Sequence, residues 1–272
     1  MSNKHPLLLA LTLSACTGAA DVGDTSIDDD TGPRPVLDCS DEVTAYEGLP
    51  YCLTTIGLTE VKLFIPQNRD PNAPMALYLH GDTANGYYED WGFEYLVPWA
   101  MDHGVVFGAV LAPNGCSWWR NEDECSWEVE DVDATNANAL HDAMELIGDA
   151  LDASPSGVRY VGYSGGSTFL TGHFLPLYGD VHPGTIVANC GGEEPIYDFA
   201  WDTSSAATRA RNPIFYTYGS NDFMQEYIDP AVVIYNDLGF DVTVDMRPGY
   251  EHCDAGLDWD AITLDLWAPT PP

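Results

Sequence analysis

The chain has 272 residues, of which 45% are hydrophobic and 12% aromatic, a composition typical of a folded globular protein. It carries 43 acidic residues against only 9 lysines and arginines, which gives a formal net charge of −34. A surface this acidic argues against nucleic acid and anionic lipid as partners, because both would be repelled.

The N-terminal residues combine a short cationic start at Lys4 with an apolar run and with small residues just before Cys16. This order indicates an export signal over residues 1–15 and resembles a bacterial lipoprotein signal, in which Cys16 is lipidated. An ordinary signal peptide is the alternative. Residues 16–36 are polar and acidic and are predicted to be a flexible tether. We expect an exported, lipid-anchored protein of the bacterial cell envelope, at the outer membrane or cell surface, with one domain over residues 37–272.

Six further cysteines follow Cys16, and an even number in an exported chain favours disulfides. Proximity in the sequence suggests the pairs Cys39–Cys52 and Cys116–Cys125, which leaves Cys190–Cys253; fifteen connectivities are possible. A zinc site is the rival interpretation. Because the cysteines are scattered without C-x-x-C pairs, we expect no metal and no cofactor.

Short runs of β-branched and aromatic residues alternate with helical patterns along the rest of the chain. Strands are predicted at residues 61–65, 75–79, 105–111, 157–161, 185–188, 214–218 and 242–244. Helices are predicted at 140–151, 166–177 and 224–238, where Pro230 must begin or bend the last one. This alternation predicts the α/β class, with a mainly parallel central sheet and helices on both faces. Functional sites in such sheets lie at the carboxyl ends of the strands.

The sequence Gly162-Tyr163-Ser164-Gly165-Gly166 directly follows a predicted strand and precedes a predicted helix. A serine on so tight a turn adopts a strained backbone and needs small neighbours, and its hydroxyl is pushed out above the sheet edge. An ordinary glycine-rich turn is the alternative. In this context Ser164 is predicted to be a nucleophile.

A nucleophilic serine needs a base and a group that orients the base. His252 is the one histidine beyond the last predicted strand, and Asp222 follows the strand before it. A surface histidine and an ordinary turn aspartate are the alternatives, and Glu193 and Glu194 are the rival acids. The order Ser164, Asp222, His252 is that of a Ser–His–Asp hydrolase with a strand-turn-helix nucleophile.

The developing oxyanion needs backbone donors. We assign them to the N–H groups of Gly165, next after the nucleophile, and Asp82, in the loop after an early strand. The neighbouring His80 is expected to shape this loop without taking part in the chemistry.

Aromatic residues lie where a substrate would bind. Trp118 and Trp119 follow a strand at its carboxyl end, and Tyr163 precedes the nucleophile. These three are the predicted substrate-binding residues. The alternative for the tryptophans is that their rings pack on the Cys116–Cys125 loop.

The motifs L-H-G-D, G-Y-S-G-G, G-S-N-D and E-H-C, in this order over residues 58–270, resemble the α/β-hydrolase superfamily. Within it, the export signal and cysteines are similar to secreted esterases of the polyhydroxybutyrate-depolymerase and feruloyl-esterase type, although no cap segment is evident. The resemblance implies hydrolysis of small or polymeric carboxylic esters through an acyl-enzyme. A serine peptidase and a non-catalytic surface-binding protein are the alternative functions. The expected membrane contact is the N-terminal lipid alone.

Overall fold

The computed structural model describes residues 35–39, 41–44, 48–69, 73–119 and 134–267. All of them belong to one compact unit, Arg34–Pro272. The predicted signal peptide, Cys16, most of the predicted tether and Cys125 lie outside the described residues. Among the residues described, we find no helix with the length and apolar character needed to cross a membrane.

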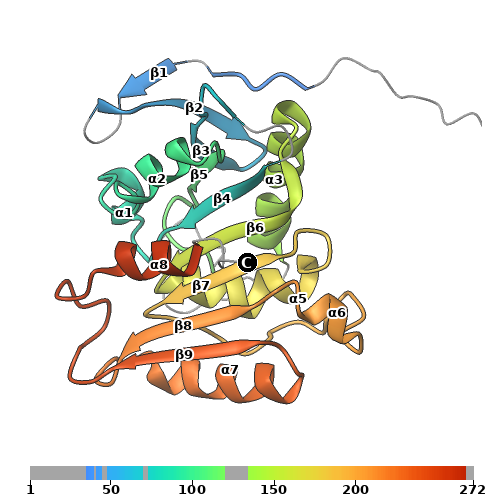
Figure 1. Cartoon of the computed structure of the whole chain (residues 1–272), viewed down its shortest axis with the longest axis vertical. Helices are drawn as coiled ribbons and strands as arrows, with labels where there is room; N and C mark the ends of the chain where they lie inside the picture. Colours follow the sequence, from blue (N-terminus) through green and yellow to red (C-terminus); the bar gives the residue numbers. More distant parts are fainter. Residues whose placement is uncertain (1–34, 40, 45–47, 70–72, 120–133, 268–272) are drawn as a thin grey trace, which may run out of the picture. The chain divides into compact units, whose positions relative to one another are not determined.

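One nine-stranded sheet forms the centre of the unit, in the order β1-β2-β3-β5-β4-β6-β7-β8-β9 (Figure 1). The pairs from β5 through β4 to β9 are parallel, whereas β1, β2, β3 and β5 pair antiparallel. The strands are β1 (Asp41–Thr44), β2 (Pro50–Ile56), β3 (Thr59–Phe64), β4 (Pro74–Leu79), β5 (Phe107–Val110), β6 (Ser154–Tyr163), β7 (Gly184–Asn189), β8 (Ile214–Gly219) and β9 (Val242–Arg247). All seven predicted strands are present; β1 and β2 were not predicted.

Helices cover both faces of the sheet. One face carries α3 (Thr135–Leu151), α4 (Gly165–Phe169), η2 (Leu170–Phe174), α5 (Leu175–Tyr178) and α7 (Gln225–Asp237). The other carries α1 (Asn85–Tyr88), α2 (Leu96–Asp102) and α8 (Trp259–Trp267), and the short α6 (Ala206–Arg209) precedes β8. The predicted helix over 166–177 contains a π-helical turn, η2. Pro230 lies inside α7 and so does not begin it; the helix there lacks one N–H donor.

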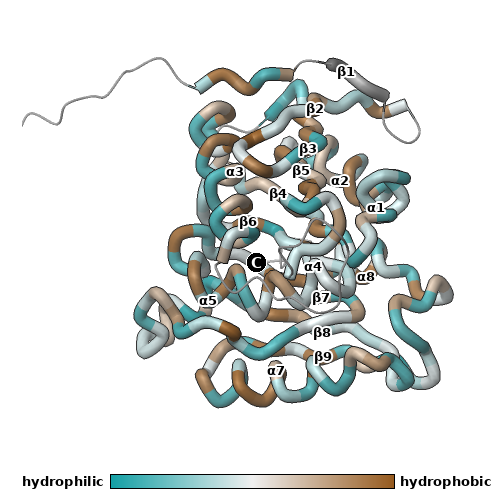
Figure 2. Tube along the Cα trace, turned by 180° about the vertical axis from the view of Figure 1, so that it is seen from behind, coloured by the Kyte–Doolittle hydropathy of each residue, from teal (hydrophilic) through white to brown (hydrophobic). Residues whose placement is uncertain are grey.

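The core consists of two apolar layers, one on each face of the sheet. In β4, Leu77 and Leu79 pack into the layer under α3, and Ala76 and Tyr78 pack into the layer under α2 and α8. Because strand side chains alternate between faces, a strand buried on both sides must be apolar throughout. Helix α7 lies on the outside of the first layer. Apolar and polar residues alternate along it (Figure 2), as expected for a helix with one buried face.

A buried lysine joins the sheet to the segment after β4. Lys62 on β3 is 6% exposed. Its Nζ donates to the Tyr87 carbonyl and to Asp90 Oδ1, both at 2.6 Å, and lies 4.4 Å from the centre of the Tyr87 ring. These contacts satisfy the buried charge and hold α1 and the following turn against the sheet.

Candidate active site

Ser164 lies on a sharp turn between β6 and α4, with φ 48° and ψ −114°. This backbone conformation is rare for a residue with a side chain and is held by the packing around it. A Cβ on Gly166 would lie 2.4 Å from the Leu79 carbonyl oxygen, and one on Gly162 would lie 2.6 Å from the Ser167 nitrogen. The flanking glycines are therefore required for the chain to turn this closely.

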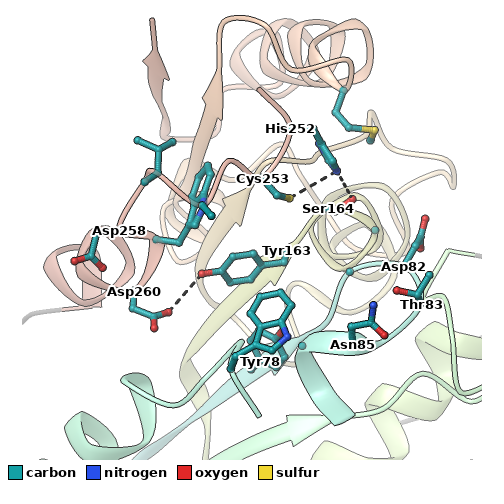
Figure 3. Close-up of a pocket in the computed structure, with 18 of the residues that line it drawn as sticks. Tyr78, Asp82, Thr83, Asn85, Tyr163, Ser164, His252, Cys253, Asp258 and Asp260 are labelled. Atoms are coloured by element: carbon teal, nitrogen blue, oxygen red, sulfur yellow. Dashed lines mark hydrogen bonds between the residues drawn. The ribbon is translucent and has the colours of Figure 1, made fainter. Parts of the chain in front are cut away.

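Three predicted residues from separate loops meet at this turn. The Ser164 hydroxyl lies 3.0 Å from His252 Nε2, and His252 Nδ1 lies 2.8 Å from Asp222 Oδ1 (Figure 3 shows the first contact). The Asp222 side chain is fully buried and also accepts the Met224 N–H at 2.8 Å. When Nδ1–H donates to the carboxylate, the lone pair of Nε2 faces the serine hydroxyl. The histidine is therefore oriented to accept a proton from Ser164.

The predicted disulfide Cys190–Cys253 is present, as is Cys39–Cys52. Cys190 directly follows β7 and Cys253 adjoins His252, so the bridge ties the histidine loop to the neighbouring strand end. The Phe223 ring centre lies 4.3 Å from that of the His252 imidazole. Cys116 is disulfide-bonded as well, although its predicted partner lies outside the described residues.

His80 fixes the loop after β4 to the segment after β5. Its buried ring accepts the Ala112 N–H at Nε2 (3.0 Å), so Nδ1–H donates to the Gly81 carbonyl (2.7 Å). Burial lowers the pKa of His80 to about 4, against a smaller opposing effect of the Gly81 bond. The ring is therefore neutral at pH 7, and it is not part of the described cleft wall.

The same segment holds Asp82. Its Oδ1 accepts from the Ser117 hydroxyl at 2.7 Å and from Trp119 Nε1 at 3.0 Å. A Cβ on Gly165 would lie 2.4 Å from Asp82 Oδ1, and a Cβ on Gly81 would lie 3.3 Å from Ser164 Cβ. The loops that carry the two predicted oxyanion donors, Gly165 and Asp82, are therefore packed against each other beside Ser164.

The predicted aromatic residues have different positions. Trp119 and Tyr163 line the cleft above Ser164. Trp118 is fully buried, with its ring 4.9 Å from Phe169 and 5.7 Å from His80. The prediction that Trp118 binds substrate is not supported: Trp118 and Trp119 lie on a turn, and the Trp118 side chain points into the core.

The cleft has a volume of about 1500 Å³. This exceeds the 300–1000 Å³ that is typical of small-molecule pockets. Four exposed aromatic residues that the sequence analysis did not single out belong to its wall: Trp91, Tyr95, Phe223 and Tyr227. A cleft this large and aromatic has room for a substrate with an extended apolar part.

The described lining of the cleft contains acidic residues and neither lysine nor arginine. Asp82, Glu226, Asp258 and Asp260 contribute carboxylates. Asp260 Oδ1 accepts from the Tyr163 hydroxyl at 3.4 Å (Figure 3). Burial raises the pKa of Asp260 to about 7; the Tyr163 bond acts in the opposite sense, and the charges of Asp258 and Glu94 add to the rise.

The rival acids are not at the site. Glu193 donates its N–H to Thr171 Oγ1, under the helix that follows Ser164, and neither Glu193 nor Glu194 belongs to the described cleft wall. Cys190, His252 and Cys253 bring three possible metal ligands together. The two sulfurs are bonded to each other, however, and provide no thiolate.

The fold is similar to that of hydrolases of known structure. A carboxylesterase from Bacillus cereus superposes with a TM-score of 0.57 at 15% identity, covering 77% of this chain and 93% of the esterase. A thermostable esterase gives the same TM-score and identity over 84% of this chain and 61% of the esterase, so this chain spans about three fifths of that protein. A poly(3-hydroxybutyrate) depolymerase from Bordetella parapertussis gives 0.50 at 16% identity, covering 79% and 87%.

No family model matches the sequence, and no curated protein matches it. At 15–16% identity, the structural likeness bears on the fold. The sheet order, the helices on both faces and these neighbours together confirm the predicted α/β-hydrolase fold.

Proposed function

We propose that this protein is a serine hydrolase that cleaves carboxylic esters through an acyl-enzyme. The observation that carries the proposal is the position of the His252 ring, which lies 3.0 Å from Ser164 Oγ and 2.8 Å from Asp222 Oδ1 through its two nitrogens. This arrangement suits proton transfer from the serine and stabilisation of the imidazolium that results.

Ser164 Oγ attacks the ester carbonyl while its proton passes to His252 Nε2. The C–O bond to the alcohol then breaks, and the same proton passes to the leaving oxygen, which yields the acyl-enzyme. A water molecule next loses a proton to His252 and attacks the acyl carbon, and Ser164 leaves with that proton. Asp222 remains ionised throughout and stabilises the imidazolium.

The negative charge of each tetrahedral intermediate is stabilised by the N–H groups of Gly165 and Asp82. Gly165 begins α4, where the helix dipole also favours negative charge. Ser117 and Trp119 position Asp82 through its carboxylate. Loss of one such donor typically lowers the rate about 100- to 1000-fold.

The substrate class follows from the cleft. Its aromatic wall and its size favour an ester with an extended apolar or polymeric acyl part, and its carboxylates disfavour anionic substrates. A serine peptidase with the same triad is the alternative enzyme, and a binding protein is the alternative to an enzyme. For localisation we propose export and lipid attachment at Cys16, on the N-terminal sequence pattern alone.

The first test is labelling of the oxidised protein with a fluorophosphonate probe, followed by mass spectrometry of the modified peptide. Labelling at Ser164 is expected in the parent and in the matched control Ser156→Ala, whose serine is exposed and distant, but not in Ser164→Ala. An unlabelled, correctly folded parent would exclude an activated serine. p-Nitrophenyl esters against peptide p-nitroanilides then separate an esterase from a peptidase.

A further inference from the structure

A second cluster of reactive side chains lies away from the cleft. His141 and Glu145 are four residues apart on α3, so they share one face of the helix. His182 lies in the turn before β7, at the opposite end of the parallel strands from Ser164. The three donor atoms, His141 Nδ1, Glu145 Oε1 and His182 Nε2, lie within 4.8 Å of one another.

Both histidine rings are held in place. The His141 ring stacks on Tyr178, with ring centres 4.3 Å apart and planes 11° apart, and the Tyr178 hydroxyl donates to Asn138. The buried His182 ring lies nearly parallel to Phe174, with centres 6.2 Å apart. Their nitrogens are therefore aimed at a common point without further ordering, which lowers the entropy lost on binding a ligand there.

A hydrogen bond between the rings does not account for the whole cluster. His141 Nδ1 and His182 Nε2 lie 2.8 Å apart and share one proton, yet Glu145 Oε1 also lies 3.4 Å from His182 Nε2. The carboxylate oxygen therefore lies beside the same imidazole nitrogen that already contacts His141.

The donor set matches a transition-metal ion. Zinc binds imidazole nitrogen and carboxylate oxygen at about 2.0–2.2 Å, which places neighbouring donors about 3.3 Å apart in tetrahedral geometry. The 3.4 Å contact fits this spacing, and the 2.8 Å contact needs to open by about half an ångström. Metallation of Nε2 places the His182 proton on Nδ1, which is buried with no partner among the described residues, so this ligand forgoes the second hydrogen bond that metal-bound histidines usually make.

We propose that His141, Glu145 and His182 form a binding site for Zn²⁺ or a similar divalent transition-metal ion. The Glu145 side chain is 50% exposed, whereas His182 is buried, so the ion enters from solvent and keeps at least one open coordination position. The ion joins α3 to the turn before β7. Its role is to stabilise the fold, since it lies at the amino ends of the parallel strands, opposite the end that carries Ser164.

The test is titration of the chelator-treated full chain with Zn²⁺, followed by calorimetry. An excess of Mg²⁺ occupies oxygen-only sites on this acidic protein, because Mg²⁺ prefers oxygen ligands. We expect one tight equivalent of Zn²⁺ and a rise in Tm with Zn²⁺ concentration. Co²⁺ loading is expected to give visible absorption bands from a site of low coordination number.

Matched variants test which side chains bind the ion. His141→Gln and Glu145→Gln are expected to weaken Zn²⁺ binding by at least about tenfold. His103→Gln and Asp149→Asn remove an exposed histidine and an exposed carboxylate, the latter one turn further along α3, and are expected to bind as the parent does. Circular dichroism confirms folding. Equal binding by all four variants, or no tight equivalent in the parent, would overturn the proposal whatever the protein's hydrolytic activity.

Discussion

The carboxyl group of Asp260 offers a quantitative test of the electrostatics of the cleft. Asp260 lies in the first turn of α8, and its pKa is raised from 3.8 to about 7, chiefly because burial disfavours the charged form. In the unfolded chain the carboxyl ionises near its ordinary pKa. Between these two values the folded protein holds a proton that the unfolded chain has lost, so the stability contributed by this group falls as pH rises from about 4 to 7.

The expected change in the free energy of unfolding follows from the size of the pKa shift. About three pKa units at about 1.4 kcal/mol each correspond to about 4 kcal/mol of destabilisation above pH 7, which is absent at pH 4. Asn in place of Asp cannot ionise and still accepts the Tyr163 hydroxyl. Asp260→Asn is therefore expected to match the parent near pH 4 and to be more stable by several kcal/mol at pH 8.

The measurement is urea unfolding of both proteins with disulfides intact at pH 4, 5, 6, 7 and 8. The difference in free energy of unfolding isolates Asp260, because most other titrating groups contribute equally to both proteins. Asp258→Asn is the control. The Asp258 side chain is exposed, so the free energy of unfolding of this variant relative to the parent is expected to vary much less with pH. A stability difference that stays constant over this pH range would refute the electrostatic argument.

Three further predictions concern the catalytic residues and substrate. Asp222→Asn is expected to lower kcat on the order of 1000-fold or more, because an amide favours the wrong tautomer of His252. Replacing both Cys190 and Cys253 by serine is expected to cost about 4 kcal/mol of stability for a separation of 63 residues, and to reduce activity in conditions where the fold persists. A neutral p-nitrophenyl ester is expected to exceed an anionic one of equal length in kcat/KM by about tenfold at low salt, with the ratio shrinking as salt screens the carboxylates.

Each of these has a distinct contradicting result. Unchanged kcat in Asp222→Asn would mean that another group orients His252. If the double serine variant lost turnover and circular dichroism signal in parallel, the disulfide would act on folding alone. Equal hydrolysis of neutral and anionic esters would show that the cleft carboxylates do not reach the substrate.

The meeting of Ser164, Asp222 and His252 was predictable because each follows a strand of a parallel sheet. Ser164 directly follows β6, Asp222 is the third residue after β8, and His252 follows β9, so their side chains were expected to gather at the carboxyl ends of the strands. The positions of the strands and of the turns that follow them are local properties, which hydrophobic runs and glycines reveal in the sequence. The disulfides were harder, since fifteen pairings were possible, but two of the three proposed pairs are present.

Features that depend on the path of a loop were not predictable. Trp118 and Trp119 are adjacent in the sequence, yet one is in the core and the other in the cleft, because the turn on which they lie points their side chains in different directions. His141 and His182 are 41 residues apart, and only the tertiary packing of α3 near the turn before β7 brings them together. The raised pKa of Asp260 depends likewise on burial that no local pattern indicates.

Lys62 and Lys4 are the only lysines in the sequence, which makes Lys62 a natural chemical reporter. Its amine is buried and bound to Asp90 and to the Tyr87 carbonyl, in the same stretch of chain that supplies Trp91 to the cleft wall. An amine-reactive reagent can modify Lys62 only when this stretch detaches from the sheet. The rate at which Lys62 acquires an acyl tag, followed by mass spectrometry, therefore reports the rate at which that wall opens, without any mutation.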